Sequence, residues 1–301
     1  MTDTRSPYRR HDRTSFFKYC SLSTALSVVR NQSIRWSAPT RFNDPFDVPR
    51  AATVDFSVAE LRKACDKEYV RLIDTDGRTL HPRIRQVQDV LRVHPDPEVR
   101  KALIREYLAG QKVLDPPSSD AFEVLADIWR TQVAQLRILC TSEVNDSASM
   151  WDRYADRHCG VVFELGCGDD VDSALVLARQ IIYRDEPPRL PGVVVWAKAI
   201  TLQPEADLSG IWSEYFYVKR SDWSNEREWR VITFAKDGAT ADYTDYPVAP
   251  GELLAVYVGY RASGEQVASL LSALGPVHGH VRVYREVIDQ STGRIAFIAY
   301  A

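Results

Sequence analysis

The feature that most limits the fold is a change in the sequence pattern near residue 137. Before it, residues 57–138 carry apolar side chains three and four positions apart, broken by prolines, which is typical of amphipathic helices. After it, the chain passes through short segments rich in β-branched and aromatic residues, which is typical of strands. The regular alternation of strand and helix that builds a doubly wound parallel sheet is missing. We therefore predict an α+β fold with a mixed or antiparallel sheet core and a helical insert in the first half.

The domain organisation follows from the same change of pattern. Residues 1–14 are polar and basic, and we expect a disordered arm there. Residues 15–301 should form a single α+β domain with 57–136 as a mainly helical insert, although 301 residues are also enough for two coupled domains. We expect strands in SFFKYC, SIRWS, GVVFEL, VVVWAKAIT and EWRVITF, and helices in SLSTALSVVR, SASMWDRYADRH and SGEQVASLLSAL. Ser21 or Ser23 should cap the first of these helices and Ser263 the last.

Composition argues against several classes of protein. The formal net charge is −3, so no overall positive field indicates nucleic-acid binding, although two helical segments carry several cations and leave this open. The five scattered cysteines fit neither a disulfide framework nor a zinc knuckle. No signal-peptide pattern and no long apolar window occurs, so we expect a cytoplasmic protein without membrane contact. Motifs of P-loop, dinucleotide-binding, zincin and α/β-hydrolase proteins are missing.

Two glutamates flank one arginine in the stretch NEREWRVITF. If this stretch is extended from residue 226, Glu226, Glu228 and Arg230 share one face, because side chains alternate along a strand. The two carboxylates are then about 6.5–7 Å apart at the backbone and can line one pocket. Arg230 can hold Glu228 in a bidentate pair and keep it ionised. The alternative is a polar strand end with both glutamates in water.

A second polar group lies in the loop FNDPFD. Asn43, Asp44 and Asp47 supply oxygen atoms that a hard cation can bind. Such residues more often accept hydrogen bonds from the backbone of their own turn. We therefore expect a structural role and no metal. A metal-dependent nuclease that uses Asp44, Asp47 and the glutamates is the weakest of three hypotheses.

The third polar group lies in LCTSEVNDSASMWDRYADRHCGVVFEL. Thr141 and Ser142 fall where a strand should end, and Trp151 and Tyr154 fall on the short helix that follows. His158 and Cys159, which precede Gly160, suggest a Cys–His nucleophile pair, but adjacent residues at a helix end point in different directions. A histidine there is more typical of a cation at a helix C-terminus.

These stretches, in this order, resemble a widespread bacterial family catalogued only as domain of unknown function 2971. The resemblance is carried by FFKYCS, IRWSAPTRFNDPFD, LCTSEVNDSASMWDRYADRHCGVVFEL and KRSDWSNEREWRVI. Together they cover residues 16–47 and roughly 138–234, while the helical segment between them looks variable. The family name comes with no activity, so this resemblance alone implies no chemistry.

The order of the motifs also resembles ADP-ribosyltransferases. Those enzymes share an opening strand with Arg or His, a middle strand that ends in Ser or Thr, and a late Glu, often written E-x-E. Here Thr141 and Ser142 would stand for the middle motif and the stretch ERE for the last. The opening position would fall at Lys18 or Tyr19, where this sequence departs from the pattern because neither Arg nor His is present.

The second resemblance implies roles for these residues. Glu228 would stabilise the oxocarbenium-like charge that forms when the bond between nicotinamide and ribose breaks, and would orient the 2′-hydroxyl. Glu226 would position or deprotonate the acceptor, and Ser142 would hydrogen-bond Glu228 or the ribose. The residues implied for binding NAD are Lys18, Tyr19, Thr141, Trp151, Tyr154 and Arg230, with Trp223 as a further aromatic plane. For the three aromatics, Trp151, Tyr154 and Trp223, a place in the hydrophobic core is the more ordinary role.

We therefore expect an ADP-ribosyltransferase-like enzyme that uses NAD as a substrate, needs no metal, and modifies an unknown intracellular macromolecule. The alternative is a non-catalytic module of a bacterial defence or stress system that binds or senses a nucleotide or another small ligand. The substitution Glu228→Gln separates the two, because a binding module tolerates it and a transferase loses nearly all turnover.

Overall fold

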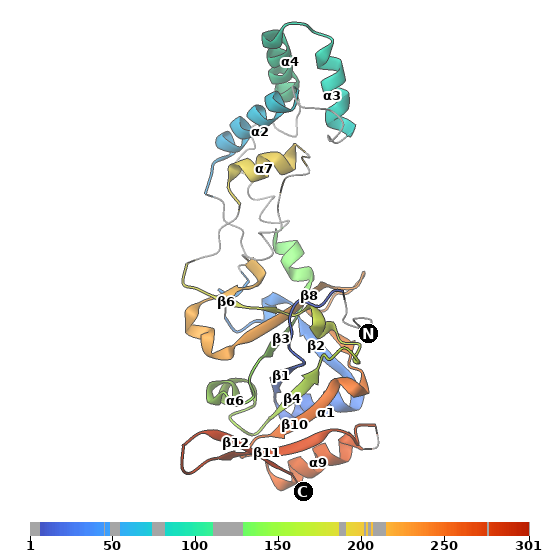
Figure 1. Cartoon of the computed structure of the whole chain (residues 1–301), viewed down its shortest axis with the longest axis vertical. Helices are drawn as coiled ribbons and strands as arrows, with labels where there is room; N and C mark the ends of the chain where they lie inside the picture. Colours follow the sequence, from blue (N-terminus) through green and yellow to red (C-terminus); the bar gives the residue numbers. More distant parts are fainter. Residues whose placement is uncertain are drawn as a thin grey trace. The chain divides into compact units, whose positions relative to one another are not determined.

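The structure is a computed structural model that describes residues 7–44, 46–48, 55–73, 82–110, 129–186, 191–201, 203, 206, 215–275 and 277–300. The chain divides into two compact units (Figure 1). The sheet unit comprises residues 1–47, 132–186 and 219–301, and the helical unit comprises residues 48–131 and 187–218. Most of the expected insert, 57–136, thus falls in the helical unit, which also includes residues 187–218. The expected division of the chain into an arm, a domain and an insert stays a prediction.

The sheet unit contains the mixed sheet that the sequence predicts. Its strands follow the order β12 (Ile295–Ala299), β11 (Arg282–Ile288), β10 (Leu253–Val258), β4 (Val161–Gly166), β1 (Ser15–Cys20), β3 (Leu136–Ser142), β2 (Ser33–Ser37) and β9 (Tyr243–Pro247). Strand β8 (Glu228–Phe234) also pairs with β3, and β5 (Arg179–Gln180) pairs with β8. Only the pair β10–β11 is parallel among these described pairs. The short strands β6 (Ile182–Tyr183) and β7 (Val218–Lys219) form a separate pair.

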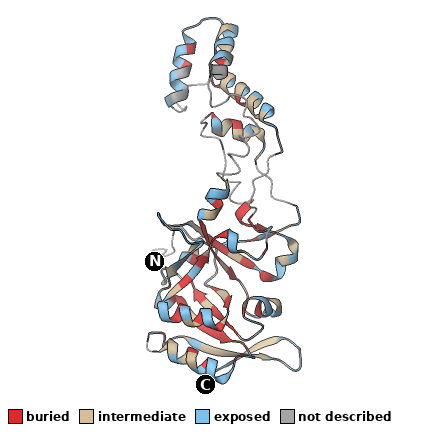
Figure 2. Cartoon of the chain, turned by 180° about the vertical axis from the view of Figure 1, so that it is seen from behind, coloured by how far each residue is buried: buried red, intermediate tan, exposed pale blue. Residues whose placement is uncertain are grey.

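Helices cover both faces of this sheet. Helices α1 (Leu22–Asn31) and α9 (Gly264–Leu274) pack together and share one hydrophobic core with Phe16 of β1. Helix α6 (Ala148–Tyr154) shares a second core with Tyr19 of the same strand, on the opposite face because side chains alternate. Figure 2 shows buried residues concentrated along these strands. The short 3-10 helices are η1 (Pro39–Arg41), η4 (Ala174–Leu177), η5 (Ser221–Glu226) and η6 (Pro250–Glu252).

The helix caps in the sheet unit follow the sequence signals. The Ser21 side chain accepts a hydrogen bond from the Thr24 backbone N–H and begins α1, so Ser21 is the cap and Ser23 is not. Ser263 and Gln266 form a reciprocal capping box at the start of α9. The cap predicted at Ser263 is therefore confirmed.

The helical unit contains α2 (Val58–Ile73), α3 (Pro82–Arg92), α4 (Pro97–Gly110) and α7 (Val193–Ile200). The first three match the predicted periodicity. The strand predicted for VVVWAKAIT is wrong, because this run forms α7 and packs against α2, so tertiary packing overrides the β-propensity of its valines. Of the helix predicted near 120–136, only residues 129 onward are described, and 129–135 are helical. Among the described helices, none is long and apolar enough to cross a membrane.

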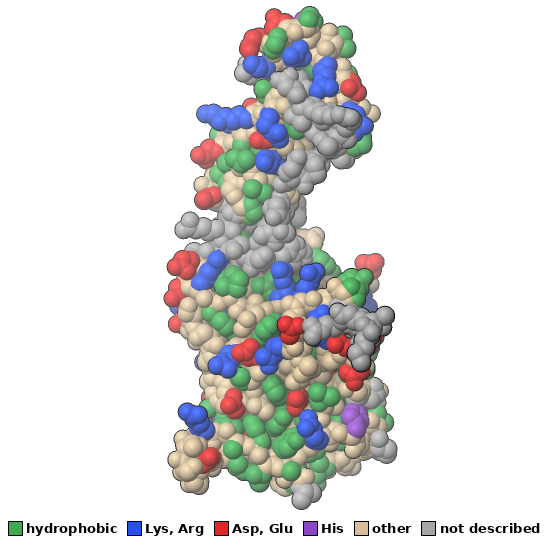
Figure 3. All heavy atoms as spheres, viewed as in Figure 1, with side chains coloured by type: hydrophobic (Ala, Val, Ile, Leu, Met, Phe, Trp, Pro, Cys, Tyr) green, Lys and Arg blue, Asp and Glu red, His purple; other side chains and the backbone are tan. Residues whose placement is uncertain are grey.

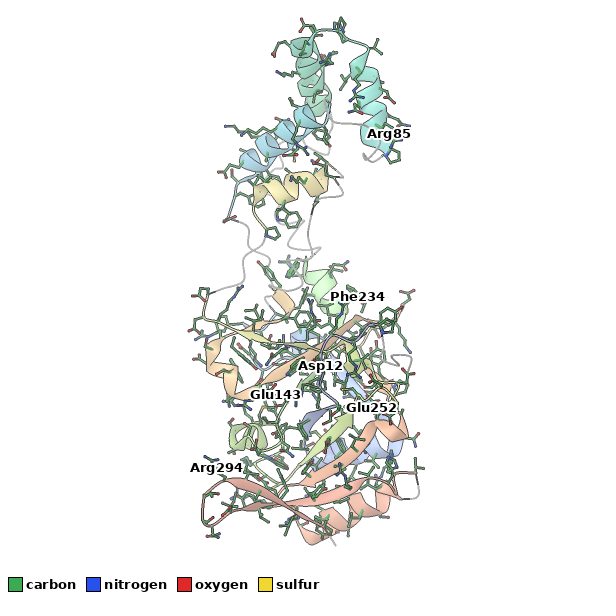
Figure 4. The ribbon with its side chains drawn as sticks, in the orientation of Figure 1. Asp12, Arg85, Glu143, Phe234, Glu252 and Arg294 are labelled. Carbon is green, nitrogen blue, oxygen red and sulfur yellow. The ribbon has the colours of Figure 1, made fainter. Side chains whose placement is uncertain are left out.

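Residues 7–14, from the segment expected to be a disordered arm, make hydrogen bonds to the rest of the sheet unit. The Arg10 backbone N–H donates to the Val176 carbonyl at 2.9 Å. The Arg13 guanidinium donates to the carbonyl of Glu143 at 2.9 Å and lies 3.6 Å from its carboxylate. Glu143, which follows β3, is labelled in Figure 4. Residues 1–6 lie outside the described residues.

Two glycines allow close contacts between backbone segments: Gly160, just before β4, approaches the end of β1, and Gly259, just after β10, approaches the turn after α6. A Cβ on Gly160 would lie 2.3 Å from the Cys20 carbonyl oxygen, and one on Gly259 would lie 2.1 Å from the His158 carbonyl oxygen. We expect Gly160→Ala to lower the free energy of unfolding by about 1–3 kcal/mol, because the backbone must move apart. Thermal unfolding followed by near-ultraviolet circular dichroism measures this. Gly264→Ala is the matched control, since open space surrounds that position, and equal melting temperatures for both variants would contradict the expectation.

Candidate functional site

A pocket of about 220 Å³ opens in the sheet unit. Its walls come from β1, β2, β3, α6, the loop 41–47 and the segment 219–228. These elements include all three motifs that the sequence singles out. The expected site residues on its wall include Lys18, Tyr19, Thr141, Ser142, Glu226 and Glu228.

The pocket lies where the sheet divides along one edge of β3. Strand β1 pairs with the end of β3, at Ser142, and β2 pairs nearer its start, at Ile138. Between these two points the carbonyl oxygen of Cys140 accepts a hydrogen bond from Lys18 Nζ at 2.8 Å. Lys18 thus satisfies a backbone group of the divided sheet, while its side chain also lines the pocket.

Both glutamates reach the pocket, but not along one strand. Glu226 ends the 3-10 helix η5, and β8 begins at Glu228. Arg227 between them is left-handed, with φ 45° and ψ 50°. The prediction of an extended segment from residue 226 is therefore wrong, because this turn interrupts the alternation. The two carboxylates nevertheless meet at Lys219, whose Nζ lies 2.7 Å from Glu226 Oε2 and 3.0 Å from Glu228 Oε2.

Arg230 completes this cluster from within the sheet. Its side chain is fully buried, with Nε 2.7 Å from Glu228 Oε1 and Nη2 3.1 Å from Glu228 Oε2. The predicted bidentate pair is thus present. Arg230 Nη2 also lies 2.6 Å from Asp47 Oδ2. We call Asp47, Lys219, Glu226, Glu228 and Arg230 the charged network; its three carboxylates and two cations have formal charges that sum to −1.

The network keeps Glu228 and Lys219 charged. Burial alone would raise the pKa of Glu228, but the charges of Arg230 and Lys219 outweigh it and hold this pKa well below its ordinary range. Burial alone would lower the pKa of Lys219, but Glu228 and Asp47 outweigh it and raise this pKa. Glu228 is therefore an anion and Lys219 a cation at neutral pH. Removing one partner of such a group leaves a buried charge without compensation.

Aromatic side chains contact the network from the pocket. Tyr154 Oη donates to Glu226 Oε1 at 2.7 Å, and burial together with the Glu226 charge raises the pKa of this phenol. The Trp223 ring centroid lies 4.8 Å from Lys219 Nζ. Trp151 takes no part in the pocket, because its side chain is fully buried in the core beside α6 and its indole N–H donates to a backbone carbonyl. The expectation that Trp151 stacks on a ligand is wrong.

The hydroxyl groups at the end of β3 bind the backbone. Ser142 Oγ donates to the carbonyl of Glu226 at 2.7 Å, and Thr141 Oγ1 donates to a carbonyl of β8 at 3.3 Å. Tyr19 Oη donates to a carbonyl just after β3 at 2.9 Å. Ser142 therefore does not bond Glu228 in this structure, and its bond to a ribose stays a prediction. Ser142 instead fixes the turn that carries Glu226 against β3.

Sequence reasoning missed two members of the network. It gave Lys219 no role, and it read Asp47 as a turn residue or metal ligand. No spacing rule links Asp47 to Arg230, since the two are 183 residues apart. The turn role does hold for Asp44, whose Oδ1 accepts the Phe46 backbone N–H at 2.9 Å. In the part of the chain that is described, no three His, Cys, Asp or Glu side chains are grouped to hold a metal ion.

Two arginines lie on the exposed part of the pocket wall. Arg35 pairs with Asp245 at 2.9 Å and Arg41 with Asp242 at 3.1 Å, and the two arginine side chains are 46% and 47% exposed. Exposed pairs contribute roughly 0–1 kcal/mol, so an incoming anion can compete for these arginines. It competes more readily for Arg41 than for Arg35, which holds Asp245 through two hydrogen bonds at 2.9 and 3.0 Å. Basic and acidic side chains are interspersed over the sheet unit on the face drawn in Figure 3.

One comparison with known proteins gave a match. Residues 150–231 match the model of a family described as "Protein of unknown function (DUF2971)". Searches of curated proteins and of solved structures found no match. The matched segment begins in α6 and ends in β8, so it contains four members of the charged network, Lys219, Glu226, Glu228 and Arg230. The segment that carries most of the candidate site is thus similar to the DUF2971 family, which the sequence motifs also resemble.

Proposed function

We propose that the chain is an ADP-ribosyltransferase-like enzyme that takes NAD as a substrate and transfers ADP-ribose to an intracellular acceptor in the bacterial cytoplasm. The observation that supports this best is the arrangement of three strands. Strand β3 pairs with both β1 and β8, so the opening, middle and late motifs lie side by side. Residues from all three line one pocket, although they are far apart in the sequence.

The electrostatics of the site suit this reaction. Cleavage of the bond between ribose C1′ and nicotinamide leaves the electron pair on nicotinamide and builds positive charge at C1′. The buried network has a formal charge of −1, with the half-exposed Arg153 3.7 Å from Glu226 Oε1. A fixed negative charge in a low-dielectric site stabilises the positive charge at C1′. We assign this role to Glu228, which Arg230 and Lys219 hold as an anion.

The second half of the transfer needs a base. The lone pair of the acceptor forms the new bond to C1′, and the acceptor loses a proton. We assign the removal of this proton to Glu226, which lines the pocket beside Tyr154. The half-exposed Arg35 and Arg41 suit the diphosphate of NAD, since arginine binds phosphate oxygens through paired N–H groups.

The proposal predicts that the wild-type chain releases nicotinamide from NAD. In Glu228→Gln the rate of release should fall by at least about 100-fold, because the amide keeps the shape of the side chain but removes its charge. Release is measured by liquid chromatography, with a bacterial extract as the source of acceptor. The matched control is Glu265→Gln on α9, an exposed position that should leave the rate unchanged. If folded wild-type protein releases no nicotinamide with any extract, the transferase proposal fails.

One observation favours a second candidate, a module that binds a nucleotide or another small ligand without turnover. Lys18 and Ser142 stand at two of the three motif positions, and both donate hydrogen bonds to backbone carbonyls. A binding module needs no free catalytic group at these positions. In that case NAD or a related nucleotide binds with no nicotinamide release, and Glu228→Gln still binds it.

A further inference from the structure

The pocket wall contains two buried acceptor atoms that the described residues leave unsatisfied. Asp44 Oδ2 and Asp47 Oδ1 have no hydrogen-bond partner among those residues. Both residues line the pocket and are only 6% and 5% exposed. A buried acceptor without a donor destabilises the folded chain, and native proteins satisfy nearly all such atoms. A ligand that donates hydrogen bonds at these two points would satisfy both.

Each carboxylate oxygen of the two glutamates, by contrast, already accepts at least one hydrogen bond. Glu228 Oε1 accepts from Arg230, and Glu228 Oε2 accepts from both Arg230 and Lys219. Glu226 Oε1 accepts from Tyr154, and Glu226 Oε2 accepts from Lys219. The resemblance to ADP-ribosyltransferases implies that Glu228 orients a hydroxyl group. In this structure the two aspartates are better suited to that role.

Each aspartate is fixed through one oxygen, and its other, buried oxygen has no hydrogen-bond partner among the described residues. Asp44 Oδ1 accepts the Phe46 backbone N–H at 2.9 Å, and Asp47 Oδ2 accepts from Arg230 at 2.6 Å. Such fixed carboxylates lose little freedom when a ligand binds. A divalent metal fits poorly here, because Arg230 and Lys219 already place two cations beside Asp47, the latter at 3.5 Å.

The rest of the pocket wall indicates which kind of donor fits. Arg35 and Arg41 belong to the same wall and are half exposed. Each is paired with an aspartate, Asp245 or Asp242, and an anionic group of a ligand can take the place of that aspartate, whereas an organic amine cannot. A sugar phosphate has both features, because its phosphate supplies the anionic group and its hydroxyls supply donors for the two oxygens.

We propose that Asp44 and Asp47 bind the vicinal hydroxyl groups of a ribose whose phosphates lie at Arg35 and Arg41. The choice of ribose rests on the proposed function, since NAD carries one next to the bond that breaks, but the inference concerns binding alone. Calorimetric titration with ADP-ribose and with ADP-2-deoxyribose tests it. The wild type should bind ADP-ribose about 10- to 100-fold more tightly than ADP-2-deoxyribose, because the deoxy sugar lacks one hydrogen bond to a charged acceptor.

The substitution Asp44→Asn should abolish most of this preference between the two sugars. The asparagine can still accept the Phe46 N–H, so folding should be preserved. Asp47→Asn should act in the same direction, with circular dichroism to verify its fold because it also contacts Arg230. Asp89→Asn, at an exposed position of α3, is the matched control and should keep the wild-type preference.

The outcomes separate this inference from the transferase proposal. Loss of the preference in Asp44→Asn supports the inference even if no nicotinamide is released, in which case the transferase proposal alone fails. Equal binding of both sugars by the wild type, no binding of ADP-ribose, or an unchanged preference in Asp44→Asn overturns the inference, whether or not nicotinamide is released. Displacement of ADP-ribose by ethylammonium would assign the two oxygens to a nitrogen cation and also overturn it.

Discussion

Replacement of Lys219 by methionine should lower the free energy of unfolding of the sheet unit by about 3–5 kcal/mol. Lys219 is 7% exposed, and its Nζ is the shared donor to Glu226 and Glu228. Methionine has a similar length but no charge, so two buried carboxylates lose their common partner. The three carboxylates of the network would then face Arg230 alone within the network, and their formal charges would sum to −2.

Hydrogen exchange of the backbone amides of β3 and β8 measures this change within the sheet unit itself. The matched control is Lys101→Met on α4. Lys101 Nζ also lies 2.7 Å from a glutamate, Glu98, but both side chains of that pair are exposed, at 37% and 75%. The control should change stability by less than about 1 kcal/mol. A similar small change in Lys219→Met would mean that the network is not a buried, coupled unit.

The second large effect that we expect is on the pH dependence of stability. The folded-state pKa of Glu228 lies below its ordinary value of 4.5, so its stabilisation is present above that pH and is lost as the pH falls through the folded pKa. The folded-state pKa of Lys219 lies above 10.5, so its stabilisation is present below that pH and is lost as the pH rises through the folded pKa. In acid, one such group changes stability by up to about 1.4 kcal/mol per pH unit.

Urea unfolding of the wild type and of Glu228→Gln at pH values from 7 to 3 measures the acid part. The wild type should be the more stable at pH 7, and the difference between the two should shrink below pH 4.5, the ordinary value for this carboxyl group. Glu265→Gln, at its exposed position, should run parallel to the wild type at every pH. A difference between wild type and Glu228→Gln that stays constant with pH would contradict the assigned pKa shift.

The sequence predicts the local parts of this molecule well. Alternation in EWRVITF predicts a strand and a contact between Arg230 and Glu228, and both are present because residues two apart on a strand share a face. Serine before an apolar helix predicts the cap at Ser263. Such features depend on neighbours within a few positions, so the sequence pattern is enough to find them.

The remaining parts depend on contacts that no local pattern encodes. Glu226 reaches the pocket through a left-handed Arg227, and the rule of alternation does not extend across such a turn. Asp47 joins the network through Arg230, far along the chain, and its role appears only when the loop 41–47 folds beside β3. The run VVVWAKAI is helical because it packs against α2, whereas its β-branched residues favour a strand.

The most direct test of the proposed site is a crystal structure of the chain with ADP-ribose bound. We expect electron density for the ligand in the pocket beside β1 and β3. Its terminal ribose hydroxyls should lie within about 3.2 Å of Asp44 and Asp47, the usual limit for a hydrogen bond, and its diphosphate should lie at Arg35 and Arg41. Density on another face of the chain, or an empty pocket at saturating ligand, would contradict both the site and the function proposed for it.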